Sequence, residues 1–195
     1  MALIRPRLRR VALVAFAVGV VCVLIFGLLI SWPIGMVVGL VVGAPTALSA
    51  LLTMRRRIWL AGTTVHSRRA IGEKRVDLAS AVSAELQVRA ARVSQVILRI
   101  GDGRTGLGVG LALYTDTGGR ELEVLALRRL ADALSTSELA AAAAVSSLLV
   151  EQLRAEARGA GMEERPLYAA VRLVRDGGRG PITTLSDAEV AGLLD

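Results

Sequence analysis

Residues 11–54 read VALVAFAVGVVCVLIFGLLISWPIGMVVGLVVGAPTALSALLTM and contain no Asp, Glu, Lys, Arg or His. A transmembrane helix needs about 20 apolar residues to cross roughly 30 Å of hydrocarbon, so a single helix of this length would be about twice as long as the bilayer is thick. Pro33 offers a place to turn, because proline is tolerated at the first position of a helix and disfavoured inside it. The sequence therefore predicts a transmembrane hairpin over 11–54, with helices at 11–30 and 34–52.

The arginines predict the orientation of this hairpin. The formal net charge is +7, from 24 Lys and Arg against 17 Asp and Glu. Arginines cluster in 1–10, before the first helix, and at 55–57, after the second, and these seven account for the whole excess. Basic residues that flank short spans stay on the cytoplasmic side. We therefore expect a two-span cell-membrane protein with both termini, including the basic segment 1–10, in the cytoplasm.

Several of these residues are expected at the membrane–water interface, where arginines meet lipid headgroups and indole rings favour the boundary. They are Arg9, Arg10, Trp32, Arg55, Arg56, Arg57 and Trp59. For Trp59 a place in the core of a domain is an equally open interpretation. A cleaved signal peptide is disfavoured, because its apolar region would cover only about 7–15 residues.

The second predicted span carries a row of small residues. Gly35, Gly39, Gly43 and Ala47 are four positions apart and share one helix face. Such a face lets another helix backbone come close. Its partner is either the first helix of the same chain or a second copy, which leaves homo-oligomerisation open.

After residue 57 the pattern becomes that of a folded domain. Alternating apolar and polar positions predict about seven short antiparallel strands, at 57–60, 64–69, 74–77, 83–89, 93–100, 109–114 and 120–125. Residues 126–134 are expected as a short helix or an irregular lead-in. A long helix over 136–158 follows, opened by a capping box of Ser135 and Glu138 and closed by Gly159.

The fold class is therefore predicted as α+β, with the hairpin followed by a small antiparallel β-barrel that a long helix caps, over 58–159. The tail, 160–195, is expected to hold a strand or short helix at 167–174 and a loop at 176–181. A second capping box, Ser186 with Glu189, predicts a final helix over 187–194. The apolar face of that helix is expected to dock on the domain or on a partner.

The chain resembles small two-span membrane proteins of high-GC Gram-positive (actinobacterial) bacteria that carry a cytoplasmic pleckstrin-homology-like (PH-like) domain. The resemblance rests on IWLAGT at 58–63, RRAIG at 68–72, RVDLA at 75–79 and LADAL at 130–134. It implies a seven-stranded barrel capped by a helix, and no defined ligand. Relatives that bind phosphoinositides use a basic pocket between the first strands, where Arg68, Arg69, Lys74 and Arg75 fall. Glu73 and Asp77 interleave with them, which favours a solvated strand face.

Sequence motifs that would indicate catalysis or ligand binding are weak. Residues 101–106, GDGRTG, match G-x-G-x-x-G, but a dinucleotide site needs a helix to open there and the next residues alternate like a strand, so a hairpin loop is expected. His66 is the only histidine, and Cys22, the only cysteine, lies within the predicted hairpin, so a metal site or triad has few components. We expect no catalytic residue, cofactor, metal or small-molecule substrate.

These observations predict a non-enzymatic integral membrane protein that acts as a membrane-tethered cytoplasmic interaction or scaffold module. Its expected partners are the lipid bilayer and a protein partner or its own oligomer. Nucleic acid is not expected, because the chain beyond the flanking arginines is neutral. The alternative is an oligomeric membrane structural protein that assembles through the glycine face of the second span.

Overall fold

The structure, a computed structural model, describes residues 57–68 and 72–194. The described residues 58–67 and 73–194 belong to one compact unit. The predicted hairpin at 11–54 lies outside the described residues. Within 57–68 and 72–194, no helix combines the length and the apolar character needed to cross a membrane.

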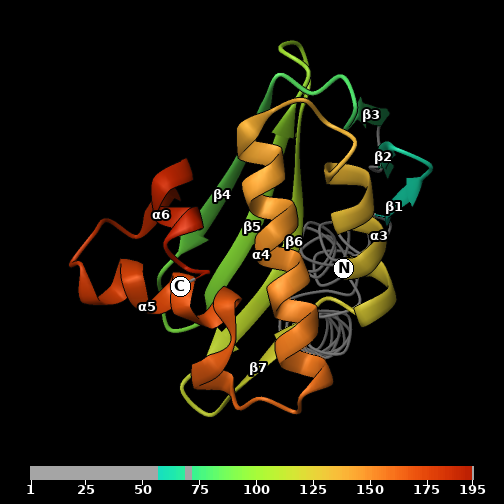
Figure 1. Ribbon diagram of the computed structural model, residues 1–195. Coiled ribbons are helices and arrows are strands. Elements are labelled where there is room, and N and C mark those ends of the chain that lie inside the picture. Colours follow the sequence, from blue (N-terminus) through green and yellow to red (C-terminus); the bar gives the residue numbers. More distant parts are fainter. Residues whose placement is uncertain (1–56, 69–71, 195) are drawn as a thin grey trace, which may run out of the picture. The chain divides into compact units, whose positions relative to one another are not determined.

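The centre of the unit is a five-stranded antiparallel sheet in the order β7-β6-β5-β4-β8 (Figure 1). Its strands are β4 (Ser83–Arg89), β5 (Ser94–Gly101), β6 (Gly106–Thr115), β7 (Gly118–Glu121) and β8 (Ile182–Leu185). Alternation along β4 buries Ala84, Leu86 and Val88 on one face of the sheet. Leu86 pairs with Leu98 of β5 in the register of the sheet. Full burial of one such leucine contributes about 1.5–3 kcal/mol.

A smaller three-stranded sheet precedes it, in the order β1-β2-β3. Its strands are β1 (Arg57–Ala61), β2 (Thr64–Arg68) and β3 (Glu73–Asp77). Val65 and Val76 bury their side chains in the common core. The turn between β1 and β2 contains Gly62 at a φ of 61°, a left-handed conformation that glycine adopts without steric cost.

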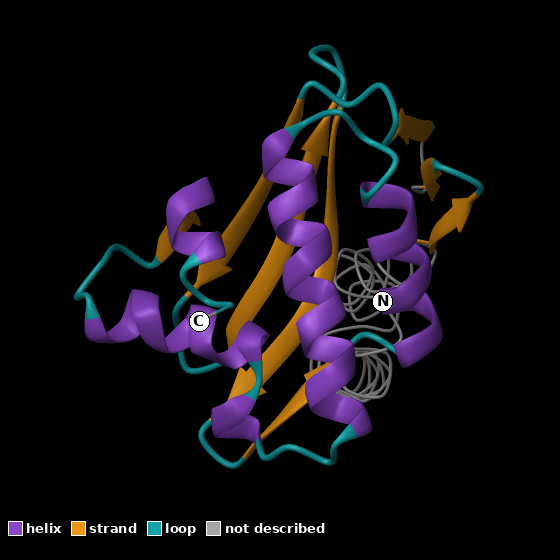
Figure 2. Cartoon of the chain, in the orientation of Figure 1, coloured by secondary structure: helices purple, strands orange, loops and turns teal. Residues whose placement is uncertain are grey.

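Helices cover one face of the five-stranded sheet (Figure 2). They are α3 (Val124–Leu134), α4 (Ala140–Ala157), the 3₁₀ turn η1 (Met162–Glu164), α5 (Pro166–Asp176) and α6 (Asp187–Ala191). Helices α4 and α5 pack directly on the sheet, and α3 packs against α4. Leu127, Leu148, Leu149 and Leu167 are fully buried between these layers.

The predicted α+β class is confirmed for the described residues, but the predicted closed barrel is wrong. The sheets stay separate because β4 has only two edges. One edge pairs with β5 and the other with β8, so neither is left for β3. The long helix α4 accordingly lies along a sheet face instead of capping a barrel end (Figure 1).

Two local predictions are also wrong. The strand predicted at 120–125 ends at Glu121, and α3 begins at Val124. The capping box of Ser135 with Glu138 does not form, because Ser135 closes α3 and its hydroxyl donates to the Asp132 carbonyl at 2.7 Å. Helix α4 begins after Leu139 without a side-chain cap.

Other local predictions are confirmed. Residues 101–106 form a hairpin loop, with Gly101 paired to Gly106 across the antiparallel strands β5 and β6. The capping box of Ser186 and Glu189 is present at the start of α6. Of the two alternatives for the final helix, docking on the domain is the one observed: Val190 is buried and α6 packs against α4, although α6 ends at Ala191 and not at 194. Strand β8, which was not predicted, joins the sheet.

Candidate functional site

Most residues predicted to act at the membrane lie outside the described residues. This holds for Arg9, Arg10, Trp32, Arg55 and Arg56, and for the glycine face of Gly35, Gly39, Gly43 and Ala47. Arg57 is the first residue of β1. Trp59 is 40% exposed, which excludes the interpretation as a core residue. Its placement at a membrane interface stays a prediction.

Trp59 belongs to a polar cluster on the three-stranded sheet. Its indole ring stacks on His66 of β2, with ring centroids 5.2 Å apart and an interplanar angle of 8°. Nδ1 of His66 lies 2.9 Å from a carboxylate oxygen of Glu73, which also accepts from Nε of Arg75 at 3.1 Å. Hydrogen bonds from His66 and Arg75 hold the pKa of Glu73 below its usual value. Glu73 therefore offsets the charge of Arg75 in the region of the first strands, where phosphoinositide-binding relatives would have a basic pocket.

A second cluster is buried around Glu121, whose side chain is only 8% exposed. The carboxylate accepts from Oη of Tyr114 at 2.6 Å, from Nε2 of Gln152 at 2.8 Å and from Nη1 of Arg165 at 2.6 Å. Gln152 is fully buried, and its Oε1 accepts from the backbone N–H of Leu167 at 3.1 Å. One carboxylate thus connects β6, β7, α4 and the start of α5.

The environment of Tyr114 completes this cluster. Its ring meets Tyr168 of α5 edge-on at a centroid distance of 5.1 Å. Burial, followed by the neighbouring Glu121 carboxylate, raises the pKa of the Tyr114 hydroxyl, so it stays a hydrogen-bond donor. A surface cavity of about 510 Å³ opens beside it, lined among others by Asp116, Met162 and Arg165. Because Glu121 already holds three donors, we assign the cluster a structural role.

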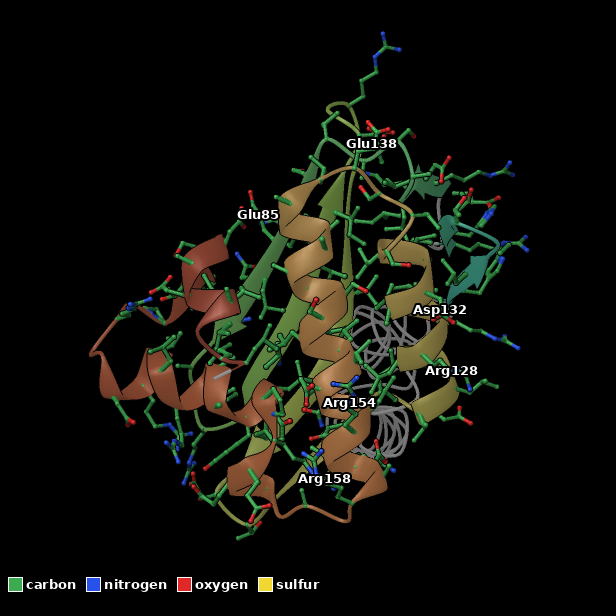
Figure 3. The ribbon with its side chains drawn as sticks, in the orientation of Figure 1. Glu85, Arg128, Asp132, Glu138, Arg154 and Arg158 are labelled. Atoms are coloured by element: carbon green, nitrogen blue, oxygen red, sulfur yellow. The ribbon has the colours of Figure 1, made fainter. Side chains whose placement is uncertain are left out.

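A third feature is the surface where α3 and α4 lie side by side (Figure 3). Residues three or four apart share a helix face, and exposed side chains follow that spacing on both helices. We call this surface the α3–α4 face. Its members are Val124, Arg128 and Asp132 of α3, Ala140, Ala143, Ser147, Val150 and Arg154 of α4, and Arg158, which follows α4.

Hydrogen bonding fixes how the two helices meet. Oγ of Ser146 donates to the carbonyl of Ala131 at 2.9 Å, so these residues face each other. Val150 follows Ser146 by one turn, and Val124 precedes Ala131 by two turns on the same side. Because the helices run antiparallel, both valines lie toward the same end of the α3–α4 face. Val124 is 48% exposed and Val150 is 37% exposed.

Comparison of the chain with models of protein families, with curated proteins and with solved structures gave no match. The resemblance to PH-like two-span proteins therefore stays a prediction. Among the described residues, no group of three or more His, Cys, Asp or Glu is arranged to hold a metal ion.

The sequence-based prediction missed the two features that organise the described surface and core. The alternating strand predicted over 120–125 would place Glu121 on its polar face, whereas the structure buries the Glu121 side chain. Val124 was assigned to that strand, and the structure exposes it at the start of α3. The uncharged run from 139 to 150 was the available signal for the α3–α4 face, since a surface helix ordinarily carries charge on its outer side.

Proposed function

We propose that this protein is a membrane-tethered interaction module. The predicted hairpin holds the described unit against the cytoplasmic face of the membrane, and the α3–α4 face binds a protein partner. The observation that supports this proposal is the exposure of valines at 124 and 150 beside an uncharged stretch of α4. Contiguous exposed apolar surface marks protein interaction sites more often than it marks ordinary protein surface.

The charge distribution supports the tether. The arginines that flank the predicted hairpin carry the net charge of +7, so the remainder of the chain is balanced. A balanced surface has no general attraction for anionic polymers or lipids, and specific contacts must come from shape and local charge. This favours a protein partner over nucleic acid.

Photocrosslinking in living cells tests the proposal. We would incorporate benzoylphenylalanine in place of Val124, in the full-length chain, and compare it with the same substitution at Val82. Val82 is 61% exposed in the connection between β3 and β4, which is not part of the α3–α4 face, and provides a matched control. We expect a protein adduct at position 124 and little at position 82.

A parallel measurement tests the tether. Green fluorescent protein fused after Asp195 is expected to fluoresce in the membrane fraction, because the C-terminus is predicted to be cytoplasmic. Equal crosslinking at positions 124 and 82 would contradict the proposal that the α3–α4 face binds a protein partner. Fluorescence in the soluble fraction would contradict the proposal that the hairpin anchors the protein in the membrane.

A further inference from the structure

The outer side of α4 is unusual for a helix at a protein surface. Its first exposed positions are Ala140, Ala143, Ser147 and Val150, and no charged residue occurs between Leu139 and Val150. Helices of globular proteins normally place charged side chains on the face away from the core. Small side chains on that face would let a second helix approach to an axial separation of about 8 Å.

The charges lie at the two ends of this uncharged stretch and have opposite sign. Glu138 lies two residues before α4, and Arg154 and Arg158 lie at its end (Figure 3). Arg154 forms an ion pair with Glu151 on its own helix. Within the described part of the chain, neither Glu138 nor Arg158 takes part in a side-chain ion pair or hydrogen bond.

This arrangement is self-complementary. In a dimer with two-fold symmetry each contact occurs twice, with residue i on one protomer meeting residue j on the other. If two α4 helices cross antiparallel with the axis at Ser147, Glu138 stands nine residues before the axis. At 1.5 Å per residue the start of α4, Ala140, lies about 10 Å from the axis, and Glu138 lies beyond that point, toward the partner's residue 156. Arg154 and Arg158 bracket that position, so both ends bring opposite charges together.

Other occupants fit this surface less well. A parallel pair of α4 helices would place Glu138 against Glu138 and Arg158 against Arg158, which repel. An anionic lipid surface would attract the arginine end and repel the end that carries Glu138 and Asp132. A second copy in the antiparallel orientation brings opposite charges together at both ends of the uncharged stretch.

We therefore propose that the α3–α4 face is a homodimer interface, in which α4 of one protomer packs antiparallel against α4 of a second copy. Ser147 lies at the two-fold axis, and Glu138 pairs with Arg158 of the partner subunit. This inference rests on the proposed interaction module and identifies its partner as a second copy of this chain.

Disulfide crosslinking of the full-length chain tests the interface. Cys22 is the only cysteine, so Cys22→Ala provides a background without thiols. In that background Ser147→Cys places two thiols at the axis, within reach of a disulfide if the Cβ atoms lie about 4 Å apart. Ser80→Cys, an exposed serine between β3 and β4, is the matched control. Mild oxidation is expected to give a dimer from Ser147→Cys at least about fivefold above Ser80→Cys, since about 1 kcal/mol of preference corresponds to that ratio.

Charge reversal tests the pairing. In the Ser147→Cys background, Glu138→Arg and Arg158→Glu are each expected to lower the dimer yield about fivefold, because symmetry places two affected pairs in every dimer. The double variant is expected to restore the yield, because opposite charges face each other again. A Ser147→Cys yield no higher than that of Ser80→Cys, or a double variant no better than the single ones, would overturn the dimer.

The outcome distinguishes the two proposals. If the adduct at position 124 contains a different protein and Ser147→Cys gives no dimer, the interaction module stands and the homodimer fails. If position 124 gives no adduct and Ser147→Cys gives no dimer, both fail. A disulfide dimer that survives both charge reversals unchanged would contradict the proposed antiparallel register.

Discussion

At the scale of single residues, the packing around Tyr114 depends on Gly119, its neighbour across the strands. The two residues pair directly in the β6–β7 register. A Cβ added at Gly119 would collide with the Tyr114 ring, whose hydroxyl is held by Glu121 and whose edge is held by Tyr168. The ring is therefore held by contacts at its hydroxyl and at one edge, and a shift away from an added Cβ would disturb both.

This packing predicts that alanine substitutions at two adjacent glycines differ in their effect on the stability of the fold. Gly119→Ala is expected to lower the free energy of unfolding by about 1–3 kcal/mol, the usual cost of overpacking a filled site. Gly118→Ala is the control, because nothing lies within 4 Å of its added Cβ. It is expected to change stability by less than about 0.5 kcal/mol. Urea unfolding followed by circular dichroism measures both, and equal effects would contradict the packing argument.

At the scale of elements, the end of the tail depends on one carboxylate. Glu189 pairs with Arg179 and accepts from the backbone N–H of Ser186 at 2.8 Å and from its hydroxyl at 2.9 Å. Arg179, and next the backbone N–H of Ser186, lower the pKa of Glu189 to about 2 from 4.5. These contacts connect the loop before β8 to the start of α6.

A pH dependence follows from that shift. The carboxylate is favoured in the folded state, so its contribution is complete above 4.5 and is lost as the pH falls toward about 2. Glu189→Gln is therefore expected to lower the melting temperature at pH 6. The gap from the wild-type protein is expected to close between pH 4.5 and about 2. Thermal scans over this range measure the gap, and a gap of constant size would show that Glu189 does not act through its charge.

Arg179→Gln provides the control for the same contact. It removes the cation that contributes most to the lowered pKa of Glu189. We expect its effect and that of Glu189→Gln to be less than additive, because both remove one ion pair. Additive effects would mean that the two side chains stabilise the tail independently.

At the scale of the whole molecule, the cluster around Glu121 joins elements that are distant in sequence. Arg165 follows Glu121 by 44 residues and Gln152 follows it by 31. The cluster attaches the start of α5 to β7 and α4, and so helps to hold the tail on the sheet. The packing of α5 against the rest of the unit therefore depends on these hydrogen bonds as well as on apolar burial.

Replacement of this carboxylate is expected to weaken the whole unit. Glu121→Gln keeps the shape but removes the charge and turns an N–H₂ group toward donors, so a loss of about 2–4 kcal/mol is expected. Glu163→Gln is the control, because Glu163 forms an exposed ion pair with Arg172 and exposed pairs contribute less than about 1 kcal/mol. Unfolding in urea measures both variants. A similar small loss in each would show that the Glu121 cluster carries no special stability.

Much of the chain could be predicted from local pattern. Strand β4 was predicted with its observed bounds, because its strict alternation reflects one buried and one exposed face. The Gly101–Gly106 loop and the Ser186–Glu189 cap were predicted because turns and caps involve residues that are close in sequence. The predicted strand over 120–125 failed because period-two alternation also fits a short strand that leads into a helix.

The sequence by itself determined what depends on neighbouring residues: the uncharged stretch at 11–54, the arginines around it, and the positions of most strands and caps. Only the tertiary structure decided which elements pair. It placed β8 on the open edge of β4, and so left the sheet open. It also buried Glu121 and exposed Val124. The physical reason is that strand pairing and burial depend on residues that are distant in sequence, whereas hydropathy and capping depend on adjacent ones.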